Sequence, residues 1–159
     1  MIIMGIDPGT AASGYGIIEQ DKKGALKVIH YDNIKTLKEH LMQDRLLKIY
    51  TSTMYLVEKY KPDIFVIESL FFNTNAKTAI SVGQARGVYM LVAAQNKLPV
   101  FEYTALQAKM VLTGYGRSSK PEVRDKVAEC LNIKTKITPI DASDALAMAL
   151  CYTIKNAKS

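Results

Sequence analysis

The chain has 159 residues, and its 48% hydrophobic and 23% charged content excludes a disordered or fibrous protein. Its 21 Lys and Arg against 15 Asp and Glu leave a net charge of +6, which favours a polyanionic partner. Two cysteines without a CxxC pair exclude a disulfide scaffold and a cysteine-rich zinc site. No apolar run approaches the ~20 residues of a membrane span, and Asp7 interrupts the apolar N-terminus too early for a signal peptide. We therefore expect one soluble, cytoplasmic domain, residues 1–159.

The first half of the chain predicts three strands, a helix and a fourth strand. A continuous apolar run favours a buried strand at 2–6, followed by a turn at Asp7-Pro8-Gly9-Thr10. Strand-like segments follow at 14–19 and 26–31, and apolar residues recur at helical spacing over 37–60. Residues 63–68 repeat the first pattern, because this apolar run also ends in a carboxylate, Glu68.

The second half predicts mainly helices, at 76–96, 104–113, 120–131 and 141–156, with a short strand at 98–102. Ser119 and Glu122 have the spacing of a helix start, with Pro121 in the first turn. Three consecutive strands suggest an antiparallel meander, and the later strand–helix–strand steps suggest parallel crossovers. The pattern predicts an α/β domain with a mixed central sheet flanked by helices.

Four acidic residues are candidate metal ligands. Asp7 and Glu68 each follow a buried strand, at the sheet edge where open α/β folds bind ligands. Asp141 and Asp144 lie three residues apart at the start of the last helix, so they point to one side of it. If all four converge, a hard divalent cation such as Mg²⁺ is the expected counter-charge. Alternatively, Asp7 is a turn residue and the other two Asp are helix-start acids.

Several motifs occur in an order that resembles the RuvC family of Holliday junction resolvases. The matching segments run through nearly the whole chain: 5–10, 14–16, 67–71, 82–87, 101–103 and 141–147. The resemblance implies an RNase H-like fold with a five-stranded sheet. It implies an Mg²⁺-dependent endonuclease that cuts four-way DNA junctions in homologous recombination and DNA repair, with Mn²⁺ as a substitute ion. Two ions per subunit, a homodimer, and the RuvA and RuvB branch-migration proteins as partners are implied in the same way.

The resemblance also assigns site residues. Asp7, Glu68, Asp141 and Asp144 match the family's four metal-binding acids, although some members have His in place of Asp141. Lys109 and Lys120 match two lysines near those acids, where they would hold the scissile phosphate and offset its developing charge. Phe71 matches the aromatic residue that stacks at the junction.

Further DNA contacts are expected near these residues. Phe72 either joins Phe71 in stacking or anchors its loop in the core. Asn75 follows in the same loop, and Lys77 would replace the basic residue that many relatives have where this chain has Thr74. Residues 104–136 hold seven basic side chains against three acids. They include Arg117, which lies in a glycine-containing segment. We expect this segment to be flexible and to follow a DNA backbone. Alternatively, the basic side chains of 104–136 only form a solvated surface.

The helix at 76–96 is the expected dimer interface. Gly83 and Gly87 permit close approach, and Tyr89 and Leu91 are expected to face outward.

Three other functions remain open at this level. An actin-like or sugar-kinase ATPase shares the pattern at 5–10, but such enzymes are commonly more than twice this length. A closer alternative to a junction resolvase is another RNase H-like nuclease, one that acts on RNA–DNA hybrids. A non-cleaving junction-binding module is also conceivable, but it should lack one or more of the acids.

Overall fold

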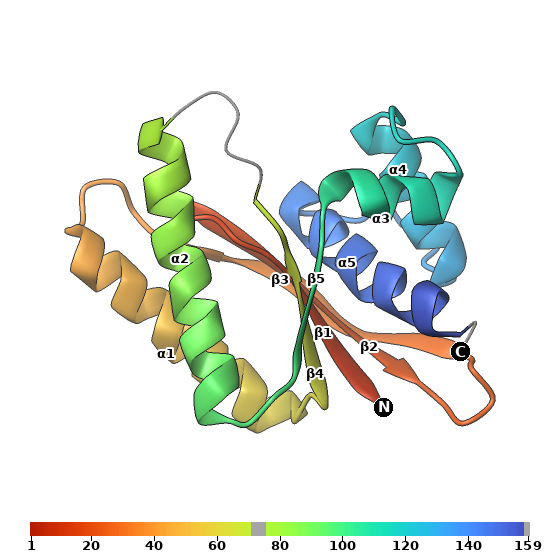
Figure 1. Ribbon diagram of the computed structural model, residues 1–159, viewed down its shortest axis with the longest axis horizontal. Helices are drawn as coiled ribbons and strands as arrows, with labels where there is room; N and C mark the ends of the chain where they lie inside the picture. The colour runs from red at the N-terminus through yellow and green to blue at the C-terminus, as the bar shows by residue number, and fades with distance from the viewer. Residues whose placement is uncertain (71–75, 158–159) are drawn as a thin grey trace.

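A five-stranded sheet runs through the middle of the molecule, and helices cover both of its faces (Figure 1). The structure is a computed structural model that describes residues 1–70 and 76–157, with the backbone alone at residues 76 and 77. Its strands lie in the order β3-β2-β1-β4-β5. Their bounds are β1 (Ile2–Asp7), β2 (Ala12–Gln20), β3 (Leu26–Lys35), β4 (Ile64–Glu68) and β5 (Val100–Tyr103).

The sheet is mixed, as predicted. β2 pairs antiparallel with both β1 and β3, whereas β4 pairs parallel with both β1 and β5. Figure 1 shows α1 (Met42–Tyr60) and α2 (Ala76–Gln95) on one face of the sheet. The other face carries α3 (Ala105–Thr113), α4 (Lys120–Cys130) and α5 (Ile140–Asn156). Each face therefore has its own apolar core.

Two helix starts show where local sequence decides a boundary. Ser119 and Glu122 form the expected capping box at the start of α4, with each side chain bonded to the other's backbone N–H. Helix α1 begins at Met42 rather than near residue 37, because the backbone of Leu41 is extended. No side chain caps this start of the helix. Just before it, the Thr36 N–H donates to the Ala11 carbonyl at 3.0 Å, which ties this segment to the β1–β2 turn.

Helix α2 contains one error of the sequence prediction. Tyr89 was expected to face outward, but its side chain is fully buried against the sheet, whereas Leu91 is 52% exposed. Gly83 and Gly87 do face open space. Within the described residues, no helix is both long enough and apolar enough to cross a bilayer.

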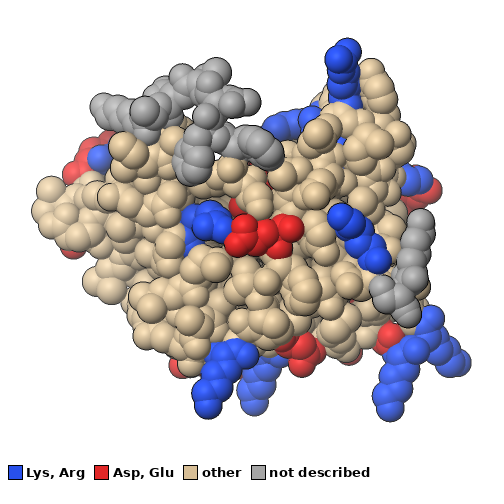
Figure 2. All heavy atoms as spheres, viewed as in Figure 1, with Lys and Arg blue, Asp and Glu red and all other residues tan. Residues whose placement is uncertain are grey.

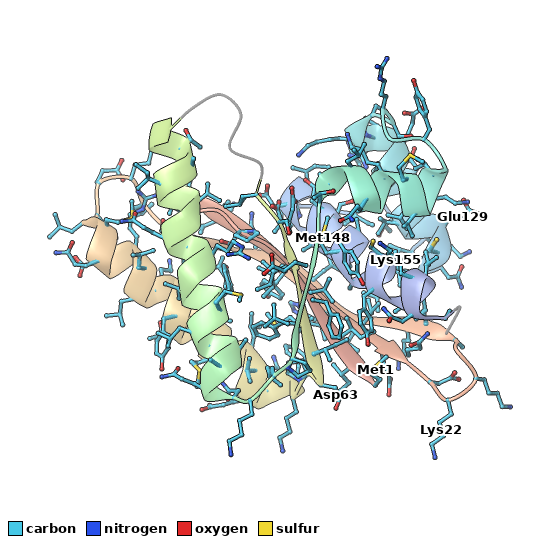
Figure 3. The ribbon with its side chains drawn as sticks, viewed as in Figure 1. Met1, Lys22, Asp63, Glu129, Met148 and Lys155 are labelled. Atoms are coloured by element: carbon cyan, nitrogen blue, oxygen red, sulfur yellow. The ribbon has the colours of Figure 1, made fainter. Side chains whose placement is uncertain are left out.

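Strand alternation places the strand-end carboxylates on one side of the sheet. Ile3 and Ile64 belong to the core under α5, and every second residue along a strand faces the same way. Asp7 and Glu68 are each four residues further on, so both emerge on the α5 side. Figure 3 shows Met1 and Asp63 together at the opposite end, where these two parallel strands begin.

Helix α5 lies directly on the backbone of β1 and β2. A methyl group at Gly5 would lie 2.0 Å from the Ala145 carbonyl oxygen, and one at Gly14 would lie 1.9 Å from the Asp141 carbonyl oxygen. Only glycine permits such an approach. The start of α5 is thereby held against the strand ends.

Candidate active site

A cavity of about 180 Å³ opens where β1 and β4 end. Its polar wall consists of three carboxylates and two lysines: Asp7, Glu68, Asp144, Lys109 and Lys120. Its apolar wall comes from α3, α4 and α5, and Figure 3 labels one of these residues, Met148. Five ionisable side chains from β1, β4, α3, α4 and α5 thus meet at one place.

Lys120 supplies the ammonium group closest to the acids. Its Nζ donates to Asp144 Oδ2 at 2.8 Å, while its side chain remains 65% exposed. The hydrogen bond to Asp144 raises the pKa of Lys120, so the lysine stays protonated. Because Lys120 is the first residue of α4, the capping box at Ser119 fixes its position.

The pKa values of the strand-end carboxyl groups reflect their crowding. Burial, followed by the charges of Glu68, Asp144 and Asp141, raises the pKa of Asp7 from 3.8 to about 8. Burial and the charge of Asp144 also raise the pKa of Glu68, and a hydrogen bond from Asp7 acts in the opposite direction. Crowding therefore favours the protonated form of both carboxyl groups, because Lys120 cannot balance all of the negative charge.

Asp141 lies beside this cavity and is not among the residues that line it. Its Oδ2 accepts a hydrogen bond of 3.3 Å from Asn33 Nδ2 on β3, although its charge still reaches Asp7. The four predicted acids therefore gather as a group, with three at the cavity and one at its margin. Sequence reasoning did not find Asn33, which is 108 residues from Asp141 and carries no local signal.

The turn after Asp7 is held by buried hydroxyl groups that the sequence analysis also missed. Ser13 is fully buried, and its Oγ accepts from the Gly9 N–H at 3.0 Å and donates to the Gly9 carbonyl. Thr36 Oγ1 donates to the Thr10 carbonyl and accepts from Arg45 Nε at 2.8 Å. These contacts fix the chain immediately beyond Asp7.

The expected DNA contacts are placed only in part. Phe71, Phe72 and Asn75 lie outside the described residues, as does the side chain of Lys77. Arg117 is exposed on the connection between α3 and α4. Hydrogen bonds from Ser118 to the Tyr115 carbonyl hold part of that connection, and its expected flexibility stays a prediction. Figure 2 shows Lys and Arg side chains at the margins of one face and near its centre, separated by uncharged surface.

The donor set suits a hard divalent cation. Carboxylate oxygens are the ligands that Mg²⁺ prefers, and the raised pKa values of Asp7 and Glu68 reflect a surplus of negative charge at the site. Within residues 1–70 and 76–157, no three Asp, Glu, His or Cys side chains already surround a single point as ligands of one ion would.

The chain is similar over almost its whole length to proteins of one family. The sequence profile described as "Crossover junction endodeoxyribonuclease RuvC" matches residues 3–152. A protein of that name from Caldicellulosiruptor saccharolyticus is 44% identical over 156 residues, which cover 98% of this chain and 94% of the relative.

Solved structures agree with this assignment. RuvC of Thermus thermophilus matches with a TM-score of 0.90 and 31% identity, over 99% of this chain and 96% of that one. The structure described as "T. thermophilus RuvC in complex with Holliday junction substrate" gives a TM-score of 0.93 and 28% identity over the same shares. These matches confirm the RNase H-like fold and the resemblance drawn from the sequence motifs. This chain therefore belongs to the RuvC family of crossover junction endodeoxyribonucleases.

Proposed function

We propose that this protein resolves four-way Holliday junctions by metal-dependent phosphodiester hydrolysis at the cavity between β1, β4 and α5, during homologous recombination and DNA repair. The observation that carries the proposal is the meeting of Asp7, Glu68 and Asp144 with Lys109 and Lys120 around one cavity. Family membership supports the substrate, and residues 1–159 act as one nuclease domain.

The four acids are the proposed metal ligands. Asp7, Glu68 and Asp144 hold Mg²⁺, and Asp141 completes the set from the margin of the cavity, where Asn33 orients it. When bound, two Mg²⁺ ions per subunit would supply Lewis acidity and a nucleophilic water at neutral pH. The carboxylates would hold the ion in their ionised form, so metal binding should weaken as the pH falls.

The two lysines act on the phosphate. Lys120 is kept beside the acids by its ion pair with Asp144, and its exposed ammonium group can also reach a bound phosphodiester. Lys109 enters the same cavity from α3. Both offset the negative charge that develops on the phosphate in the transition state.

The remaining DNA contacts follow from family resemblance and position. Phe71 stacks on an unpaired base at the crossover, while Asn75, Lys77, Arg117 and Lys120 contact the backbone. Stacking of this kind is worth ~1–3 kcal/mol per base.

The assembly we propose is a cytoplasmic homodimer formed through α2, which works with the RuvA and RuvB branch-migration proteins. Resolution requires two strands to be cut together, so two active sites must be related by a two-fold axis. The outer side of α2 supports this arrangement. Ile80 is 64% exposed and Leu91 is 52% exposed, with the open backbone of Gly83 and Gly87 between them.

A labelled synthetic four-way junction tests the proposal directly. With Mg²⁺ the purified protein should make paired cuts near the crossover, and with EDTA it should bind without cutting. Linear duplex and RNA–DNA hybrid of equal length serve as controls. Cleavage of the hybrid in preference to the junction would assign the protein to another nuclease class.

A further inference from the structure

Helix α3 and the connection that follows it carry three exposed, mainly apolar side chains. Leu106 is 59%, Met110 50% and Tyr115 59% exposed. Leu106 and Met110 lie one turn apart on α3, and Gly116 packs on both of them. A methyl group at Gly116 would lie 2.5 Å from Leu106 Cδ1 and 3.3 Å from Met110 Sδ. We call Leu106, Met110 and Tyr115 together the Tyr115 surface.

The backbone at Tyr115 is unusually well fixed for an exposed connection. Its carbonyl accepts from Ser118 Oγ at 2.9 Å and from the Ser118 N–H at 3.2 Å, and its own N–H donates to Thr113 Oγ1 at 3.2 Å. Ser118 is itself buried, and the two hydroxyl oxygens of Thr113 and Ser118 lie 2.7 Å apart. Gly114 adopts the left-handed conformation (φ 76°) that ends α3. Because the backbone under the ring is already held, binding of a ligand to the ring would cost mainly the ring's own side-chain rotations.

Charge and position indicate the partner. Residues 103–121 include Lys109, Arg117 and Lys120 and contain no acidic residue. The same helix, α3, lines the active-site cavity through Ala105, Ala108 and Lys109. The connection that carries Tyr115 also leads to Lys120, five residues further on, which lines the same cavity. Tyr115 is therefore close to the active site along the chain, within a positively charged stretch. Exposed aromatic side chains among basic residues are the usual platform for unpaired bases.

We propose that the Tyr115 ring stacks on an unpaired base of the DNA strand that enters the active site. Leu106 and Met110 extend the apolar support, and Arg117 neutralises the adjacent phosphate. This inference rests on the proposed function and adds a second stacking position, on the α3–α4 side of the cavity. Its role is to hold the strand open beside the acids after the junction has been distorted.

The test uses Tyr115→Ala and Tyr115→Phe, with Tyr55→Ala as the matched control. Tyr55 is also 59% exposed but lies on α1, in a groove with Tyr15 and Lys48 on the other face of the sheet. Binding is measured in EDTA with a four-way junction that carries 2-aminopurine at the nucleotides flanking the crossover. A duplex of the same sequence measures binding without unpaired bases.

Tyr115→Ala should weaken junction binding by about 5- to 100-fold and abolish the fluorescence change at one 2-aminopurine position. Tyr115→Phe should stay within about two-fold of the unmodified protein, because it retains the ring, and so should Tyr55→Ala. All variants should bind duplex within about two-fold of one another. Circular dichroism melting checks that Tyr115→Ala is folded.

Two results overturn the inference: unchanged junction binding by Tyr115→Ala, or an equal loss with Tyr115→Phe. In both cases the unmodified protein still cuts junctions with Mg²⁺, so the proposed function stands. If the unmodified protein neither binds nor cuts a junction, the proposed function and this inference fall together.

Discussion

The two faces of the sheet are packed in different ways. Under α1 and α2 the core consists of large side chains, among which Ile49, Phe65 and Tyr89 are fully buried. Under α5 large side chains such as Ile3 and Leu146 are also fully buried, but here Gly5 and Gly14 of the strands additionally meet the helix backbone. Both faces thus supply apolar burial, and the α5 face in addition sets the distance between the strand ends and Asp144.

The two faces should therefore respond differently to substitution. Each fully buried large apolar side chain contributes roughly 1.5–3 kcal/mol, and such a core tolerates changes that conserve volume. A contact between backbones has no side chain that can move aside. Substitutions on the α5 face should therefore disturb the site more than substitutions of similar size under α1 and α2.

The largest expected effect is on catalysis, at the acids themselves. Asp7→Asn should lower junction cleavage by about 10³-fold or more, while binding in EDTA changes little, because metal affinity is lost and the basic surface is kept. Glu68→Gln and Asp144→Asn should have the same two effects as Asp7→Asn. A gel assay of cleavage and of junction binding compares the variants, and near-normal cleavage by Asp7→Asn would remove the acids from the mechanism.

Gly5→Ala tests the contact between β1 and α5. The added methyl group must displace the helix backbone at Ala145, so we expect a loss of about 2–4 kcal/mol in the free energy of unfolding. Ile49→Val, in the core on the opposite face, should cost only about 0.5–1.5 kcal/mol. Urea unfolding of both variants provides the comparison. Equal losses would mean that the two faces are packed alike.

Lys120→Ala and Lys109→Ala should each slow cleavage by about 10- to 100-fold but weaken junction binding less than about three-fold. Both lysines act at the cavity, so their effect belongs to the chemical step. Lys134→Ala is the control, because Lys134 is exposed and does not line the cavity. Single-turnover rates and binding constants are measured side by side. Identical behaviour of all three variants would reduce these lysines to general electrostatic attraction.

Leu91→Glu tests the assembly on the α2 side. A charge in an apolar interface should raise the dimer dissociation constant by about 10-fold or more and leave the folded subunit intact. Analytical ultracentrifugation measures whether the variant is a monomer or a dimer. In a cleavage assay on a four-way junction, singly nicked products should replace paired cuts. Leu47→Glu, at a 59% exposed position on α1, should remain dimeric. Dimers that persist in Leu91→Glu would place the interface elsewhere.

The smallest expected effect is the dependence of metal-free stability on pH. Because the pKa of Asp7 is raised from 3.8 to about 8, the folded protein binds its proton more tightly than the unfolded chain does. The free energy of unfolding should therefore fall as pH rises from about 4 to about 8. Asp7→Asn removes this titration, so in EDTA at pH 8 its melting temperature should exceed that of the unmodified protein by about 2–6 °C. At pH 5 the difference in melting temperature should be smaller. Melting temperatures of the two proteins that change in parallel with pH would contradict the raised pKa of Asp7.

The sequence predicted the strands and the proximity of the four acids, because each signal was local, whereas the metal-binding role of the acids stays a prediction. Glu68 follows an apolar run that has no other reason to end in a carboxylate, and Ser119 and Glu122 carry the spacing of a capping box. Thr104 and Gln107 form a second capping box at the start of α3 that the same spacing would have revealed.

What could not be predicted depends on contacts between distant segments. Asn33 approaches Asp141 only after β3 and α5 have packed on the same sheet. Tyr89 was assigned to the wrong side of α2 because apolar residues surround this helix, so no single buried face is defined by the pattern. The DNA contacts at Phe71, Asn75 and Lys77 stay predictions.

The capping box at Ser119 has a consequence for how variants of this protein would be classified. Ser119 holds the first turn of α4, and the first residue of that turn is Lys120, whose ammonium group lies 2.8 Å from Asp144. A substitution at Ser119 would fray one helical turn and at the same time misplace a cation at the acids. In a survey of many variants such a change would be scored as a loss of activity, although no atom of Ser119 lines the cavity. Hydrogen exchange at the start of α4 would reveal its origin in the helix.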